Sequence, residues 1–231
     1  MFRVRQLEDM QVDLPLIRTF THYRALLEMD TILLESKPQE PAVDYPADQR
    51  INLEFRRIFC SSRLSSGRTF RVLFRSLKQK NSLLHRLASL PNSALIASDG
   101  GLISNLTAQE NILLPVQYHA TASDESALKN AIAILARFDL NQSEVFRILQ
   151  SLPANLSVFE RRLASFARIV VIEPEILVCD TVFEGLADDE VTAISRFSEF
   201  FHQYFPFRTV IFLELDLARG IIRADQTFYL Q

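Results

Sequence analysis

The chain has 231 residues, of which 48% are hydrophobic and 23% are charged, and its formal net charge is −3. This composition is typical of a soluble globular protein that can bury one sizeable core. Its two cysteines, Cys60 and Cys179, exclude a disulfide framework. No apolar run approaches the roughly 18 residues needed to span a bilayer, and the N-terminus lacks the apolar core of a signal peptide, so we expect a cytoplasmic protein.

The N-terminal part of the chain has no clear periodicity, and "LPLIRTFTHYRALLEMDTILLE" fits helix and strand about equally. Residues 36–49 contain three prolines and mixed charge, which predicts an exposed loop. From Arg50 to Arg86 there are ten basic residues and a single acid, Glu54. Such a stripe can face phosphates, nucleic acid or anionic lipid, or can simply be solvated, and it lacks the interleaved aromatics that suit single-stranded nucleic acid.

The second half of the chain has clearer patterns. Residues 123–138 place Leu128, Ile132 and Leu135 on one helical face, with acids at the start. Two apolar runs, "EILVCD" at 175–180 and "RTVIFLEL" at 208–215, predict strands, and a helical pattern over 188–205 separates them. Strand, helix and strand at this spacing imply a parallel βαβ unit in a sheet covered on both faces. We expect four residues of the helical pattern, and the thiol of the first strand, to be buried: Phe197, Phe200, Phe201, Tyr204 and Cys179.

Four segments of this half follow one another in an order that resembles the nucleotide-binding subunit of an ABC transporter, over roughly Leu95 to Leu230. "ALIASDGGLISNLTAQENILLPVQYH" resembles the glutamine loop and the start of the helical subdomain, and "LSVFERRLASFAR" resembles the signature helix. "PEILVCDTVFEGLADDE" is similar to the Walker B strand and D-loop, and "TVIFLELDLARGIIRADQTFYL" to the last catalytic strand, the switch loop and a closing strand. The sequence "GLISNLTAQENILLP" is also similar to that of subunits of MCE/Mla-type lipid transport systems.

The resemblance implies an α/β, P-loop NTPase-like fold in which helices flank a mostly parallel sheet. It implies a single domain over 1–231, with a divergent segment at 1–50 that contributes a small β region. A helical subdomain is expected at 102–165, and the Walker B and switch βαβ core at 166–231.

The signature segment differs from what phosphate binding requires. In the family, two glycines leave backbone N–H groups bare for the γ-phosphate. Leu156 and Ser157 match, but Val158 and Phe159 stand where the glycines belong, and Glu160 replaces the glutamine. Ser157 and Glu160 also have the spacing of a capping box, which would occupy the helix N–H groups and place a negative charge there. We therefore predict that this site is closed to phosphate.

The Walker B segment keeps Asp180, but Thr181 stands where the resemblance places the catalytic glutamate. A threonine cannot act as a base, and the loss of such a group costs on the order of 10²–10⁴ in rate. Asp180 either caps the end of a buried strand or keeps a residual metal contact. The turn glycine, Gly185, is present. The D-loop aspartate, the glutamine of the glutamine loop and the switch histidine correspond to Ala187, Ser98 and Leu215.

No segment reads G-x-x-x-x-G-K-[ST], the phosphate-binding loop. The nearest candidate is "SSRLSSGRTF" at 61–70, where Gly67, Arg68 and Thr69 resemble Gly-Lys-Thr and Ser62 replaces the first glycine. Either this is an altered phosphate loop or the similarity is accidental, and arginine is not interchangeable with lysine in a tight phosphate cradle. The histidines show no metal spacing, so we expect no metal, no cofactor and no catalytic residue.

Because both halves of a composite ATP site are altered, the leading hypothesis is a non-catalytic homologue. It would be a docking or structural subunit of a membrane transport system, with lipid transport favoured, held at the inner face of the membrane by a permease or another ABC ATPase subunit. A homodimer is compatible with this hypothesis. One alternative is a soluble regulatory module whose basic region contacts an anionic partner, with nucleic acid not favoured. Another is a nucleotide sensor that binds without hydrolysis through the 67–69 segment and Asp180.

Overall fold

The computed structural model describes residues 67–119, 123–215 and 223–230, and all of them belong to one compact unit that spans Ala47–Gln231. The predicted loop at 36–49, the β region expected within 1–50, and Ser62 and Cys60 lie outside the described residues. The expectation of a single domain over 1–231 therefore stays a prediction.

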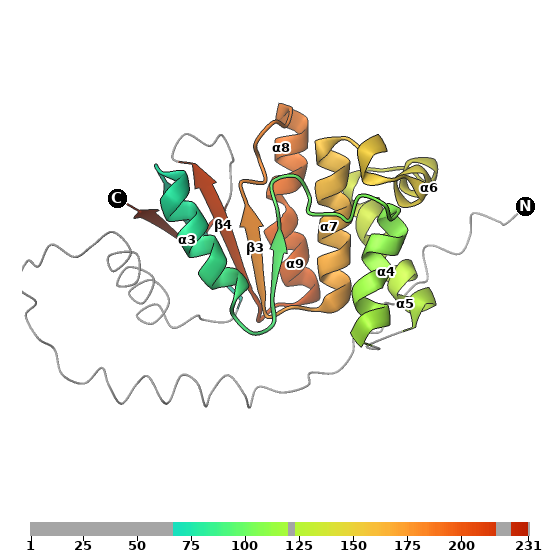
Figure 1. Cartoon of the computed structure of the whole chain (residues 1–231), viewed down its shortest axis with the longest axis horizontal. Helices are drawn as coiled ribbons and strands as arrows, with labels where there is room; N and C mark the ends of the chain where they lie inside the picture. The colour runs from blue at the N-terminus through green and yellow to red at the C-terminus, as the bar shows by residue number, and fades with distance from the viewer. Residues whose placement is uncertain (1–66, 120–122, 216–222, 231) are drawn as a thin grey trace, which may run out of the picture. The chain divides into compact units, whose positions relative to one another are not determined.

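A five-stranded sheet lies at the centre of the described part of the chain (Figure 1). Its strands are ordered β2-β3-β4-β1-β5, and all four pairings are parallel. Carboxyl ends of parallel strands meet at one edge, so the residues that follow β1, β3 and β4 are brought together. The strands are β1 Thr69–Phe74, β2 Ser93–Ile96, β3 Ile176–Asp180, β4 Thr209–Leu215 and β5 Gln226–Leu230.

Helices cover both faces of the sheet, which confirms the predicted α/β fold (Figure 1). On one face, Ile176 and Val178 of β3 pack with Leu83 and Leu87 of α3, Leu77–Ala88. On the other face, Leu177 and the buried thiol of Cys179 pack against α7 and α9. Both alternate sets of strand residues are buried, which explains the continuous apolar runs in the sequence. The helices of the second face are α7 Val158–Ile172, α8 Asp188–Ser195 and α9 Phe197–Tyr204.

A group of helices beside the sheet forms the predicted helical subdomain (Figure 1). It contains α4 Ala108–His119, α5 Asp124–Leu135 and α6 Gln142–Gln150, and short 3₁₀ turns at Ala136–Phe138 and Pro153–Asn155. The helix predicted over 123–138 is confirmed. It begins where the Ser123 side chain accepts a hydrogen bond from the Ser126 N–H, and it ends before Asp139, whose φ is 60°.

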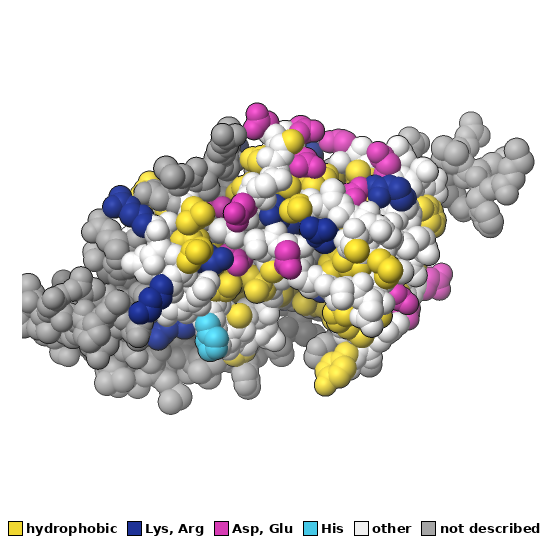
Figure 2. Space-filling view, turned by 45° about the horizontal axis from the view of Figure 1, so that its top comes forward, with side chains coloured by type: hydrophobic (Ala, Val, Ile, Leu, Met, Phe, Trp, Pro, Cys, Tyr) yellow, Lys and Arg dark blue, Asp and Glu magenta, His cyan; other side chains and the backbone are white. Residues whose placement is uncertain are grey.

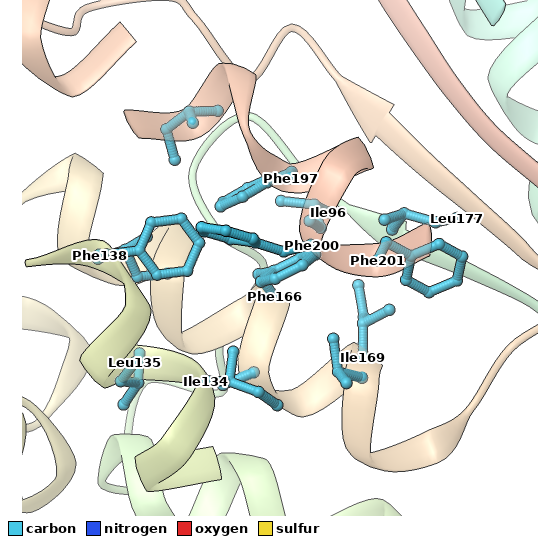
Figure 3. Close-up of a cluster of buried hydrophobic side chains, with 14 of the residues drawn as sticks. Ile96, Ile134, Leu135, Phe138, Phe166, Ile169, Leu177, Phe197, Phe200 and Phe201 are labelled. Atoms are coloured by element: carbon cyan, nitrogen blue, oxygen red, sulfur yellow. The ribbon is translucent and has the colours of Figure 1, made fainter. Parts of the chain in front are cut away.

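The pattern at 188–205 forms two helices, whereas the sequence predicted a continuous one. The helical ladder is interrupted at Arg196, whose N–H donates to the Ala193 carbonyl three residues back. The predicted core residues of α9 are nevertheless inside. The Phe197 ring stacks on Phe166 of α7 with centroids 4.3 Å apart, and Phe138 meets both rings edge-on (Figure 3). Phe200 and Phe201 are also buried, and Tyr204 packs against the same cluster while half-buried.

Candidate functional site

Buried charged side chains gather at the carboxyl edge of the sheet, where β1, β3 and β4 end. Asp180, the last residue of β3, forms an ion pair with Lys80. The Lys80 ammonium donates to the carboxylate, with Nζ 2.8 Å from Oδ1 and 3.1 Å from Oδ2. The side chain of Lys80 is 11% exposed and that of Asp180 is 8% exposed. Asp180, which the resemblance matches to the Walker B aspartate, therefore faces a cation of its own chain.

Lys80 was not identified by sequence reasoning, and its position shows where a phosphate loop would lie in this topology. It is the fourth residue of α3, and only Arg75 and Ser76 connect the end of β1 to that helix. In a P-loop fold the glycine-rich loop follows a strand and opens a helix. The available signal was Lys80 itself, which follows the strand-like "TFRVLF" at the distance of the motif lysine, although Asn81 stands where the motif has Ser or Thr.

The earlier candidate loop is at the wrong edge of the sheet. Gly67, Arg68 and Thr69 precede β1 or begin it, whereas Asp180 ends β3. The Gly67 N–H donates to the Arg208 carbonyl over 3.1 Å, which fixes this turn at the amino ends of the strands. The structure therefore does not bring Gly67–Thr69 and Asp180 together, as the nucleotide-sensor alternative would require, because the length of the strand separates them.

The connection between β1 and α3 has only two residues outside regular structure. A phosphate loop needs several consecutive residues outside regular structure, so that their N–H groups can turn toward the anion. Here the helix has already begun at Leu77, three residues before Lys80. The Ser76 side chain makes no capping bond, and the first turn of α3 has no acid. The positive end of the helix dipole is thus retained, whereas the cradle is not.

Thr181 gives the Asp180 carboxylate a second partner, a hydroxyl group, beside the Lys80 ammonium. Its Oγ1 lies 3.2 Å from Asp180 Oδ1, and its N–H donates to the Leu213 carbonyl over 2.8 Å. Its φ is +47°, which a β-branched residue rarely adopts. Both oxygens of Asp180 are therefore engaged by Lys80 and Thr181, and Thr181 offers no general base.

Glu214, the next-to-last residue of β4, is a second buried acid that sequence reasoning missed. Its side chain is 2% exposed, and burial raises its pKa to about 8. The charge of Arg71 and a hydrogen bond from the Val182 N–H lower this pKa, while the Asp180 carboxylate raises it. The acid is therefore mostly protonated at neutral pH. Leu215, the position of the switch histidine, follows directly and is 36% exposed.

The signature segment has the predicted capping box. The Ser157 N–H donates to Glu160 Oε2 over 2.9 Å, and the Glu160 N–H donates to Ser157 Oγ over 3.1 Å. Glu160 also forms an ion pair with Arg147. Val158 and Phe159 begin α7 and are half-buried, and Leu156 is buried. The N–H groups that the family would offer to a phosphate are thus partly taken by the helix's own side chains.

The remaining predicted positions are tied together by one buried arginine. Arg162 on α7 is 2% exposed, and its Nε donates to the Ser98 carbonyl over 2.8 Å. Its Nη2 donates to the Glu184 carbonyl, beside Gly185, whose φ is +72°. Ala187 ends this turn, and its N–H donates to Glu190 over 3.0 Å. Ser98 and the segment compared with the D-loop therefore lie close in space.

No cluster of three or more His, Cys, Asp or Glu side chains with metal-binding geometry occurs within 67–119, 123–215 and 223–230. In the same ranges no helix has the length and hydrophobicity to cross a bilayer.

Comparisons with known proteins agree with this fold. No family model matches the chain. A stretch of 94 residues, 40% of the chain, is 29% identical to the methionine import ATP-binding protein MetN of Chlamydia pneumoniae, and it spans about a quarter (26%) of that protein's length.

Solved structures of ATP-binding cassettes resemble the chain over most of its length. The dimeric cassette MJ0796 with ADP and phosphate aligns with a TM-score of 0.55 and 18% identity, over 72% of this chain and 82% of that one. The cbiO1 protein of Clostridium perfringens, part of the ABC transporter complex cbiONQ, aligns with a TM-score of 0.53 and 14% identity, over 65% of this chain and 68% of that one. The chain has the ATP-binding-cassette fold.

Proposed function

We propose that the chain is a non-catalytic homologue of ABC ATPases that acts as a docking or structural subunit of a membrane transport system. The observation that carries this proposal is the buried ion pair between Lys80 and Asp180. The pair lies at the edge of the sheet where the resemblance implies a nucleotide, and each charge has its partner within the chain.

Other positions that the resemblance places in the nucleotide site support the same function. The nucleophilic water would lack a base, because Thr181 stands at that position and Leu215 supplies no imidazole. Glu160 is already bonded at the start of α7, so an incoming phosphate would meet a carboxylate there. ATP turnover would need changes at several unconnected points of the backbone.

A surface for a partner lies on α4 and the loop before it. Ile103, Leu114 and Tyr118 are 44%, 39% and 83% exposed, and Figure 2 shows hydrophobic side chains on the surface over α4. Asn111, which is buried, accepts from the Ile103 N–H and donates to its carbonyl, so the loop is held rigidly beside α4. The sequence of this segment, "GLISNLTAQENILLP", is also similar to subunits of lipid transport systems. We assign the segment to contact with a membrane permease.

The test is affinity purification of the tagged full chain from native membranes in mild detergent, with identification by mass spectrometry. We expect a membrane permease to co-purify. The variant Leu114→Glu/Tyr118→Glu should lose it, because two charges would enter an apolar interface without partners. The matched control Phe146→Glu/Phe207→Glu changes two residues that are 50% and 59% exposed elsewhere and should retain it. Equal recovery with both double variants would overturn the docking surface.

A nucleotide sensor is a second candidate, because the N-terminus of α3 has no side-chain cap and no acid. Thermal-shift titration with Mg-ATP and ADP separates the two functions. The docking proposal expects no stabilisation at millimolar nucleotide, whereas a sensor would show a saturable increase in melting temperature. Measurable ATP hydrolysis by the purified chain would contradict both functions.

A further inference from the structure

The chain passes from the sheet to α4 by one connection, residues 97–107, which has no regular structure and crosses α7 (Figure 1). We call Ile103, Leu114 and Tyr118 the α4 surface, and of these three only Ile103 lies in the connection rather than in the helix. Its place on the α4 surface therefore depends on what holds the connection.

Arginines of α7 bind the first part of the connection through its backbone. Three of them each donate to a main-chain carbonyl over 2.8–3.0 Å: Arg162 to Ser98, Arg161 to Asp99, and Arg168 to Gly101. Hydrogen bonds from a charged donor are among the stronger ones in proteins. Because all three acceptors are main-chain oxygens, these bonds fix the path of the backbone itself.

Gly100 brings the connection into direct contact with α7. Its φ is +92°, and a Cβ at this position would lie 2.8–2.9 Å from the Cβ, the carbonyl carbon and the carbonyl oxygen of Arg161. These distances are too short for a side chain, so the close approach requires glycine. The three arginines therefore hold a segment that already rests on their helix.

The fixed path continues to Ile103. The Ile103 N–H donates to Asn111 Oδ1 over 2.7 Å, and Asn111 Nδ2 donates to the Ile103 carbonyl over 3.0 Å. Asn111 belongs to α4 and is 1% exposed. Ile103 is thus held by α4 directly and by α7 through residues 98–101, while its side chain remains 44% exposed.

We propose that Arg161, Arg162 and Arg168 are positioning residues for docking, which hold Ile103 in the arrangement that a permease meets. This inference rests on the proposed function, because it takes the α4 surface as the site of contact. None of the three arginines belongs to the α4 surface, so each acts through the connection. Arg162 also joins the connection to the sheet, since its Nη2 donates to the Glu184 carbonyl in the turn after β3.

The test joins amide hydrogen exchange on the purified full chain with permease recovery from native membranes. Arg168→Met removes the bond to Gly101, and Gly100→Ala adds a Cβ that cannot fit against Arg161. In both variants we expect exchange of the Ile103 N–H to rise about tenfold, since a hydrogen bond to a charged group changes an opening equilibrium by about that factor. Permease recovery should fall with it.

Two controls show whether the effect is local. Arg137→Met also removes one arginine bond, to the Gln203 side chain, and should leave both the Ile103 exchange and the permease recovery unchanged. Within each variant, the Val145 N–H, which donates to the Asn141 carbonyl at the start of α6, should exchange at the wild-type rate.

Several results would overturn the proposal. Unchanged Ile103 exchange in both variants would show that α7 does not hold the connection, and equal acceleration at Val145 would show a general loss of stability instead. Faster Ile103 exchange with full permease recovery would show that docking does not depend on this position. If the wild type recovers no permease, the proposed function fails and the role in docking fails with it. The exchange measurement needs no permease, so it still reports whether the arginines hold the connection.

Discussion

At the scale of single residues, the carboxyl edge of the sheet is organised by two buried acids in different protonation environments. Asp180 has a cation at 2.8 Å and a hydroxyl at 3.2 Å. Glu214, which follows Leu213, the partner of Asp180 in the neighbouring strand, has a pKa raised to about 8 by burial. One acid is held by a partner and the other is neutral at physiological pH, which are the two ways a carboxyl group can be buried.

Removal of one partner of the ion pair should be far more costly than removal of both. Lys80→Met leaves the Asp180 carboxylate buried without its cation, and we expect it to lower the free energy of unfolding by about 3–5 kcal/mol. Lys80→Met/Asp180→Leu should recover most of that loss, because no buried charge remains. Urea unfolding of the wild type, both single variants and the double variant measures the coupling. Additive losses would show that the two groups do not interact.

Glu214 should make the folded chain less stable as the pH rises. Its pKa is about 8 in the folded chain against an ordinary 4.5, so the folded state holds a proton that the unfolded state has released. Stability should then fall as pH rises from about 4.5 through about 8, by a few kcal/mol in total. Glu214→Gln removes this dependence. The variant should be more stable than the wild type at pH 9 and nearly equal at pH 5, as measured by urea unfolding at each pH.

The groups around Glu214 set the size of this effect. Arg71 and Arg162 favour its ionised form, and Asp180 disfavours it. Glu199→Gln on the exposed side of α9 controls for the removal of a negative charge. If the unfolding free energies of wild type and Glu214→Gln stayed parallel from pH 5 to pH 9, the carboxyl group would not be buried as described.

At the scale of elements, α4, α6 and α7 begin with the same device, and of these three only α7 begins at the signature position. Ser157 and Glu160 start α7, Asn141 and Glu144 start α6, and Thr107 and Glu110 start α4 with the same reciprocal hydrogen bonds. The capping box at α7 is therefore an ordinary solution to a free helix end, used here at the signature position.

Loss of either cap should cost similar stability. We expect Ser157→Ala to lower the free energy of unfolding by about 1 kcal/mol, because the Glu160 N–H loses its acceptor. Asn141→Ala at α6 is the matched variant, since it removes the equivalent bond to Glu144. Both are measured by thermal and urea unfolding. A much larger loss for Ser157→Ala alone would show that this serine has a role beyond capping.

Local sequence rules predicted these elements well, and the misses are contacts between distant positions. The strands at 175–180 and 208–215, the helix at 123–138 and the α7 capping box depend on residues within a few positions of each other. Lys80 and Asp180 are 100 positions apart, and only the parallel order of β3, β4 and β1 brings them together. The interruption at Arg196 was missed because 188–205 has helical periodicity on both sides of it.

At the scale of the whole molecule, the described residues place three kinds of surface on one rigid sheet. The carboxyl edge is filled by paired charges, α4 carries exposed apolar side chains, and α3 carries basic ones. In the proposed function the sheet is a scaffold that holds the α4 surface at a fixed position, and this surface does not need the carboxyl edge to open.

The two-residue connection between β1 and α3 has a consequence for the history of the chain. Point mutations could place a glutamate at Thr181 or a histidine at Leu215, since each is a change of side chain. A longer path from Phe74 to the helix also needs the first turn of α3 to unwind, as substitutions to glycine there would favour. Such a step would move Lys80 and expose the Asp180 carboxylate before any nucleotide could compensate. On the proposed function, a return to a phosphate loop therefore passes through a form of the chain that is less stable than the present one.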